Sequence, residues 1–271
     1  MTRRSAQRGF SLIEMIVAIT VLGILSAAAA VFLRGPIASY FDTERRTDLA
    51  DAGTLALAKL RQDIANAVPN GVRVATAGGR TYIELLPMRL DSAGVPSEGR
   101  YRTGGAGNVL SFGVADTGFD VLGFPVYAQA GDWVVVNNHL AGASVWTGSS
   151  RAAYTGGTGT VSTIAMASHA FAADAPDHRF QIATDPVTYL CDPAAGTVRR
   201  ISNYGSPAAV QPTAFGAGAQ NDLLAGGVLS CRAAAYPGTL RHAEVVAFEI
   251  GFGNVGERLN LAHTVRVGTL P

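Results

Sequence analysis

A single carboxylate, Glu14, lies at the start of a long apolar run near the amino terminus. The run, Met15 to Leu33, contains no charged residue. At about 1.5 Å per residue, a helix of this length crosses the hydrocarbon core of a bilayer. An ionised side chain in such a segment costs at least a few kcal/mol and usually has a designated partner. We therefore expect Glu14 to be functional.

The composition is that of a globular protein with an appendage. The chain has 271 residues, 48% of them hydrophobic, and 32 glycines. The formal net charge of +1 gives no reason to expect a nucleic-acid partner. Three arginines, Arg3, Arg4 and Arg8, precede the apolar run. Because positive residues stay cytoplasmic, everything after Leu33 is expected to face the periplasm or the exterior.

The two cysteines, Cys191 and Cys231, fit an exported domain. In an oxidising compartment such a pair is commonly a disulfide, and closing a loop of about 40 residues contributes roughly 3 to 4 kcal/mol. Two unpaired buried thiols are the alternative. Neither cysteine lies in a recognisable nucleophile motif, so a catalytic cysteine is not expected.

Two simpler interpretations of the amino terminus are a secretory signal peptide and a plain membrane anchor. Ala27 to Ala30 would offer a signal-peptidase site. Cleavage there would discard half of a continuous helical pattern, and a signal peptide gains nothing from Glu14. In a plain anchor, Glu14 would only reach back to the cytoplasmic headgroups.

The run Gly9-Phe10-Ser11-Leu12-Ile13-Glu14 resembles the type IV prepilin cleavage and methylation motif. The resemblance implies that prepilin peptidase cuts between Gly9 and Phe10 and methylates the new amino group of Phe10. The usual second mature residue of the motif is threonine, and here it is Ser11.

Cleavage at this junction would place an ammonium group at Phe10, about one helical turn from Glu14. Each charge is costly in lipid, and each becomes less so when the two pair across neighbouring chains. An axial offset of about one turn between packed helices would bring them together. Glu14 is thus expected to form an assembly salt bridge that sets the register between subunits.

A helix continues beyond the apolar run. Gly35 and Pro36 favour a kink or a local break. The pattern then becomes amphipathic and stops at Pro69-Asn70-Gly71, giving a spine of roughly 55 residues. Its expected buried stripe is Leu49, Gly53, Leu57, Leu60, Ile64 and Val68.

Short strand-like runs separated by turn residues follow from residue 71 onward. Hairpins are expected around Asp192 to Gly196 and around Gly253 to Glu257, and a surface loop over Tyr204 to Gly227. The expected strands are Val72–Thr76, Thr81–Leu86, Val109–Phe112, Trp133–Val136, Val161–Ile164, Phe180–Thr184, Val187–Cys191, Thr197–Ser202, Glu244–Gly251 and Leu259–Val267.

These patterns predict an α+β fold, with a long amino-terminal helix packed on an antiparallel sheet as in pilins. The expected segments are a leader (1–9), a transmembrane and assembly helix (10–33), its amphipathic continuation (34–69) and a β-rich exported domain (70–271).

A narrower resemblance concerns the spine and the first strand. The segments Tyr40 to Arg46, Leu57 to Arg61 and Asn66 to Val74 resemble minor pilins of the mannose-sensitive haemagglutinin (MSHA) type IV pilus. This implies a non-enzymatic, single-pass protein of the bacterial inner membrane that contributes to pilus assembly and can enter the extracellular pilus. The implied partners are prepilin peptidase, other pilins, inner-membrane lipid and the inner-membrane assembly machinery.

Two other functions share these features. A minor pseudopilin of type II secretion would have the same leader and spine. A binding module at a pilus tip would use the globular part, with Trp133 and Trp146 as candidate contacts.

No catalytic, cofactor or metal site is expected. The five histidines lack metal-ligand spacing, and Asp174 to His178 lacks the alternating pattern of a calcium loop. The glycine clusters at 104–107 and 156–159 lack the lysine of a phosphate loop, and no Gly-x-Ser-x-Gly elbow is present.

Overall fold

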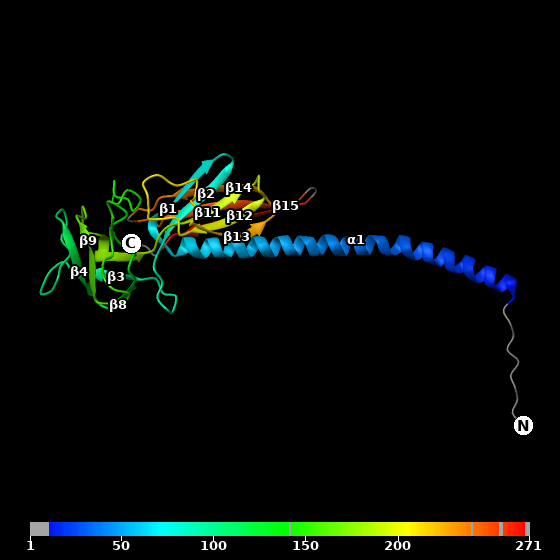
Figure 1. The fold of residues 1–271 in the computed structure, drawn as a ribbon, viewed down its shortest axis with the longest axis horizontal. Coiled ribbons are helices and arrows are strands. Elements are labelled where there is room, and N and C mark those ends of the chain that lie inside the picture. Colours follow the sequence, from blue (N-terminus) through cyan, green and yellow to red (C-terminus); the bar gives the residue numbers. More distant parts are fainter. Residues whose placement is uncertain (1–10, 141, 240, 255–256, 269–271) are drawn as a thin grey trace, which may run out of the picture. The chain divides into compact units, whose positions relative to one another are not determined.

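The computed structural model describes residues 11–140, 142–239, 241–254 and 257–268 (Figure 1). The chain divides into two compact units, the first ending at Asp48 and the second beginning at Leu49. One helix, α1 (Leu12–Ala65), contributes to both units.

The second unit begins with the last part of α1, whose apolar stripe is buried. Ala56, Leu57, Leu60 and Ile64 are at most 4% exposed. A Cβ atom at Gly53 would lie 3.0 Å from Phe252 Cε2, so a larger residue would require the Phe252 ring to shift. The helix ends at Ala65 rather than at Val68, because the chain turns into a strand ahead of Pro69.

A five-stranded antiparallel sheet packs on this stripe. Its order is β1-β2-β11-β12-β13. The strands are β1 (Ala67–Ala77), β2 (Arg80–Pro87), β11 (Val187–Asp192), β12 (Thr197–Ser202) and β13 (Gln220–Gly226). The predicted hairpin at Asp192 is confirmed, because Asp192 pairs with Thr197 across the β11–β12 turn.

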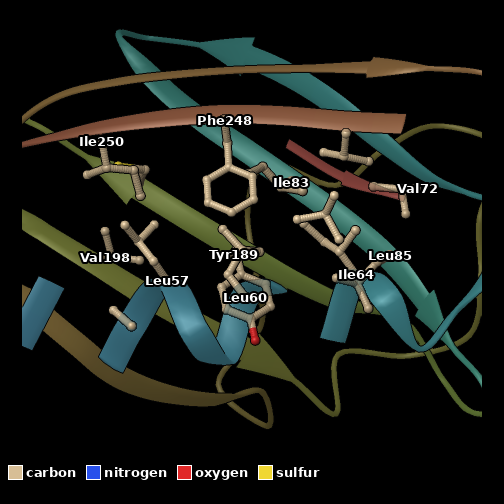
Figure 2. Close-up of a cluster of buried hydrophobic side chains, with 14 of the residues drawn as sticks. Leu57, Leu60, Ile64, Val72, Ile83, Leu85, Tyr189, Val198, Phe248 and Ile250 are labelled. Atoms are coloured by element: carbon tan, nitrogen blue, oxygen red, sulfur yellow. The ribbon is translucent and has the colours of Figure 1, made fainter. Parts of the chain in front are cut away.

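A three-stranded antiparallel sheet completes the core. It consists of β14 (Val228–Tyr236), β15 (Val245–Asn254) and β16 (Glu257–Arg266), in that order. Figure 2 shows Leu57 and Leu60 of α1, Ile83 and Tyr189 of the larger sheet, and Phe248 of the smaller sheet in one cluster. Each fully buried side chain of this size contributes roughly 1.5 to 3 kcal/mol. The predicted α+β class is confirmed.

A second lobe is inserted between β2 and β11, which are neighbours in the sheet. Its six-stranded sheet has the order β7-β6-β10-β3-β4-β9, and β5 pairs with β8. The strands are β3 (Glu98–Tyr101), β4 (Asp116–Leu122), β5 (Val126–Ala128), β6 (Trp133–Val136), β7 (Arg151–Ala153), β8 (Gly159–Val161), β9 (Thr163–His169) and β10 (Arg179–Ala183).

The inserted lobe has its own core and a defined attachment. Buried aromatic residues such as Tyr101, Phe119 and Phe180 fill its interior. A smaller cluster joins it to the main sheet, with Val68 and Leu86 packed near Val135 and Trp146. Where the chain enters the lobe, Arg89 pairs with the buried carboxylate of Asp132 at 2.5 Å.

Some strand predictions were wrong in the lobe and the last third of the chain. Val109–Phe112 forms no strand; Phe112 makes only an isolated bridge to Phe171, because nearby amides bond to the Asp116 carboxylate and the Arg102 carbonyl. The predicted strand at Val161–Ile164 divides into β8 and β9. The predicted loop from Tyr204 contains β13, a strand that begins with three polar residues and pairs along β12.

Candidate assembly site

The first turn of α1 is closed by Ser11. The Glu14 amide donates to the Ser11 hydroxyl at 3.3 Å and to the Ser11 carbonyl at 3.1 Å. A serine followed three residues later by glutamate is a capping-box sequence. The spacing of Ser11 and Glu14 is sufficient to identify this cap from the sequence, whereas the prepilin motif marks Ser11 only as a replacement for threonine.

Glu14 therefore occupies the first turn of the helix, where the positive end of the helix dipole favours a carboxylate. Its side chain is exposed and forms no ion pair with a described residue. Within the described part of the chain, the carboxylate is therefore unpaired.

The surface that follows Glu14 is apolar on every side. The segment Leu12–Gly35 has a mean hydropathy of 2.6 and is long enough to span a membrane, and none of its most apolar window is buried. The Thr20 hydroxyl donates to the Val17 carbonyl at 2.9 Å, so this polar group is satisfied within the helix. Glu14 is the one charged residue between Ser11 and Leu33.

The remaining predicted positions of this segment stay predictions. Gly9 and Phe10, the expected cleavage and methylation residues, lie outside the described residues. The helix is continuous through Gly35 and Pro36, so the chain has no local break there. A kink at this point is still an expectation.

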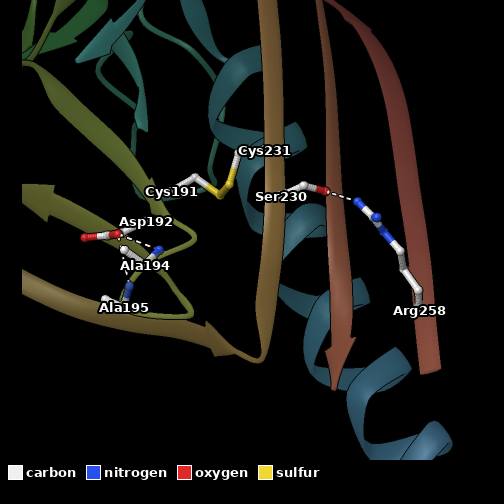
Figure 3. The surroundings of a disulfide bond; sticks show 7 residues. All are labelled: Cys191, Asp192, Ala194, Ala195, Ser230, Cys231 and Arg258. Atoms are coloured by element: carbon white, nitrogen blue, oxygen red, sulfur yellow. Dashed lines mark hydrogen bonds between the residues drawn. A yellow bond between two sulfur atoms is a disulfide. The ribbon is translucent and has the colours of Figure 1, made fainter. Parts of the chain in front are cut away.

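The two cysteines are joined in a disulfide that links the two sheets of the core (Figure 3). Cys191 lies on β11 and Cys231 on β14, with their Cα atoms 6.3 Å apart. Next to it, the Asp192 carboxylate accepts from the amides of Ala194 and Ala195 at 3.1 Å and shapes the β11–β12 turn.

Asp63 fixes the helix against the larger sheet. Its carboxylate accepts from Lys59 Nζ at 2.7 Å, from the Tyr189 hydroxyl at 2.7 Å and from Arg200 Nε at 3.0 Å. Burial alone would raise the pKa of Asp63, but these three donors outweigh it and lower that pKa. The charged carboxylate is therefore the form that the fold prefers.

The pKa of Glu244, which lies immediately before β15, is shifted in the opposite direction. It is 1% exposed, and burial raises its pKa to about 8. The backbone amides of Asn70, Gly71 and Val72, where the chain leaves α1, oppose this only in part. The burial of Glu244 is not evident from the sequence, because it depends on contacts between distant segments.

Asn70 holds three segments together at the same junction. Its side-chain amide donates to the carbonyls of Asn138 and Gly238 at 3.2 Å, and its side-chain oxygen accepts from the Gly238 amide at 2.7 Å. Asn138 in turn donates to the Pro69 carbonyl at 2.8 Å. The start of β1 is thus bonded both to the inserted lobe and to the β14–β15 connection.

The two tryptophans do not form an exposed aromatic surface. Trp146 is 7% exposed, and the Cζ atom of Arg73 lies 4.0 Å from the centre of its ring. Trp133 is half-buried, and the Cζ atom of Arg151 lies 4.5 Å from the centre of its ring. Arg73 and Arg151 also donate to carbonyls at 207–209. The rings therefore stack on the two arginines that bind the loop after β12.

The histidines and the Asp174 to His178 run show no metal site. Among the described residues, no three histidine, cysteine or acidic side chains converge as metal ligands would. Asp174 is already engaged, accepting from the Tyr101 hydroxyl at 2.5 Å and pairing with His178 at 2.8 Å.

The amino-terminal segment of the chain matches a known protein family. Residues 4–30 match the family described as the prokaryotic N-terminal methylation motif. No curated protein and no solved structure matches the chain. The matched motif implies processing by prepilin peptidase and assembly with other pilins, and it suggests a structural task. Together with the apolar helix that begins at the Ser11 cap, the match supports a type IV pilin-like or pseudopilin protein.

Proposed function

We propose that this chain is a minor pilin of an MSHA-type type IV pilus, similar to the biogenesis protein MshO. In this proposal prepilin peptidase cleaves between Gly9 and Phe10 and methylates Phe10. The observation that carries it is the isolated Glu14 carboxylate in the first turn of an exposed apolar helix, inside the matched methylation motif.

The chemistry of assembly follows from that arrangement. The new amino group of Phe10 and the Glu14 carboxylate are opposite charges that lipid solvates poorly. Pairing Glu14 with the amino terminus of a neighbouring subunit relieves both charges at once, and it does so only at one axial offset. The apolar surface between Met15 and Leu33 then packs against neighbouring helices instead of lipid.

In this proposal the globular domain is exported across the inner membrane. The arginines before Phe10 stay cytoplasmic, the helix spans the inner membrane once, and the domain from residue 49 onward is periplasmic before assembly. An oxidising compartment agrees with the Cys191–Cys231 disulfide.

The test replaces Glu14 by alanine in the full-length chain in its host. We expect the leader to be removed as in the wild type, because the Gly9–Phe10 junction is unchanged. Incorporation into purified pili should fall at least about 10-fold, since the lost ion pair lies in a low-dielectric site. Mass spectrometry of the amino terminus and immunodetection in sheared pili measure the two effects.

Glu44→Ala is the matched control, because Glu44 is an exposed carboxylate on the same helix outside the apolar segment. It should enter pili normally. Normal incorporation of Glu14→Ala would contradict the assembly role. A leader retained by the wild-type chain would contradict processing.

A type II secretion pseudopilin is the second candidate, because the matched motif covers only residues 4–30. Deleting the gene separates the two functions. Loss of surface pili with normal protein secretion supports the pilus, and the reverse result supports the pseudopilin.

A further inference from the structure

The outermost strand of the three-stranded sheet, β16, presents an unpaired edge. It borders β15 on one side, and no other described strand pairs with it. It runs for ten residues without a proline and without a register shift. Both edge strands of the larger sheet, by contrast, pair with a register shift. Long regular edges attract further strands, and proteins usually blunt or cover them.

The hydrogen-bond pattern shows which residues face this open edge. The Gly253 amide bonds to Gly227 next to β14, and the Val267 amide bonds to Glu244 at the start of β15. Because pairing alternates along antiparallel strands, the odd-numbered residues of β16 bond to β15. The backbone groups of the other residues point outward, and these are Arg258, Asn260, Ala262, Thr264 and Arg266, all exposed.

Two arginines, Arg258 and Arg266, lie near the two ends of this strand, which begins with one acidic residue, Glu257. Neither Arg258 nor Arg266 pairs with a carboxylate among the described residues. Arg258 lies across Gly251 and donates to the Ser230 hydroxyl at 2.7 Å, as Figure 3 shows, and this neutral partner leaves its charge uncompensated. A Cβ atom at Gly251 would lie 2.5 Å from Ser230 Oγ, so the glycine makes room for this contact.

The two faces of the strand differ. Leu259 and Leu261 are half-buried on the core side, where Leu261 packs on the main cluster. The other side carries the arginines and small polar residues. An acid opposite Ala262 would be disfavoured, because Glu249 lies next to Ala262 on β15. Acidic side chains on a partner therefore belong opposite the two arginines.

Self-pairing is the obvious alternative occupant, and charge disfavours it. Two β16 strands paired antiparallel about Ala262 would place Arg258 of each copy opposite Arg266 of the other. Like charges directly opposite each other destabilise a sheet.

We propose that β16 binds an extended segment of another protein by strand addition. That segment carries two acidic side chains at the spacing of Arg258 and Arg266, and apolar side chains on the face that covers Leu259 and Leu261. Main-chain bonds supply affinity and the alternate side chains supply selectivity. The proposal is independent of the pilus assignment.

The test uses the full chain in detergent and a fluorescent strand peptide. Its sequence alternates threonine and valine, with two glutamates at the arginine spacing, and a twin peptide has lysines in their place. Anisotropy should show the acidic peptide binding at least about 10-fold more tightly than its twin. Hydrogen exchange should slow at the amides of Asn260, Ala262 and Thr264 when the acidic peptide binds.

Ala262→Pro removes a backbone amide that points outward and bonds to no strand of the sheet. This variant should bind the acidic peptide at least about 10-fold more weakly. Ala262→Ser, which keeps the amide, should bind it as the wild type does. Since Ala262→Pro can disturb folding, a double variant, Arg258→Glu with Arg266→Glu, provides a second test and should reverse the peptide preference. Equal binding of both peptides, undiminished binding by folded Ala262→Pro, or no binding at all would overturn the proposal. Dimerisation of the chain alone that Ala262→Pro abolishes would overturn it in favour of a second copy.

Discussion

Glu244 is enclosed by the fold yet titratable, so it couples stability to pH. Its pKa rises from 4.5 to about 8 on folding. The neutral form is the one that the fold prefers. Its favourable contribution is therefore complete below about pH 4.5 and is lost as the pH rises through about 8. We expect the free energy of unfolding to decrease over this range.

Glu244→Gln keeps the shape of the side chain and removes its titration. At pH 7.5 the variant should be more stable than the wild type by about 1 to 3 kcal/mol, and near pH 5 the difference should shrink. Urea unfolding at several pH values measures this. Glu249→Gln, the same substitution on the outer side of β15, is the control for the chemical change itself. The interpretation fails if Glu244→Gln retains the wild-type slope.

Asp63 should show the opposite pH dependence. Its folded pKa is lowered below 3.8, so its contribution is complete above that value and is lost as the pH falls through the folded pKa. Asp63→Asn should cost about 1 to 3 kcal/mol at pH 7, because Arg200 loses its charged acceptor. Lys59→Ala should cost less than about 1 kcal/mol, since Lys59 is 46% exposed. Equal losses in the two variants would show that Arg200 and Tyr189 contribute nothing.

At the scale of elements, the disulfide connects two sheets that come from distant parts of the chain. Cys191 and Cys231 are 40 residues apart in sequence, and the segment between them contains β12, β13 and the start of β14. Replacing both cysteines by alanine should lower the free energy of unfolding by about 2 to 4 kcal/mol, measured by urea denaturation. Reducing agent should have the same effect on the wild type and none on the variant. An unchanged urea midpoint would contradict this.

Elements specified by local sequence were predictable, and those that depend on distant pairing were not. The stripe at Leu57, Leu60 and Ile64 identified the buried face of α1, and Asp192 to Gly196 identified a hairpin. The lobe strands β5, β7 and β8 have three residues each, too few to show a period of two. In the assembly site, Glu14 was evident from the sequence because an isolated charge in an apolar run is a local signal.

At the scale of the whole molecule, the inserted lobe is distinct from the main core in its connections and in its interior. It leaves the main sheet after β2 and returns at β11, and these strands pair directly, with Leu85 opposite Val187. Its interior is a cluster distinct from the one around α1. Both tryptophans of the chain, Trp133 and Trp146, lie within it. We therefore expect the main core to fold around a direct β2–β11 turn.

We expect a chain in which a short glycine-containing turn replaces residues 88–184 to retain that core. It should still form the Cys191–Cys231 disulfide and unfold cooperatively by circular dichroism, with some stability lost because Val68 and Leu86 no longer pack on the lobe. Leu57→Ala provides the decisive comparison. Leu57 is 1% exposed beneath both sheets, so its truncation should cost about 2 to 5 kcal/mol in the full chain and in the shortened one alike. A shortened chain that forms no disulfide, or in which Leu57→Ala has no effect, would show instead that the lobe is needed to build the core.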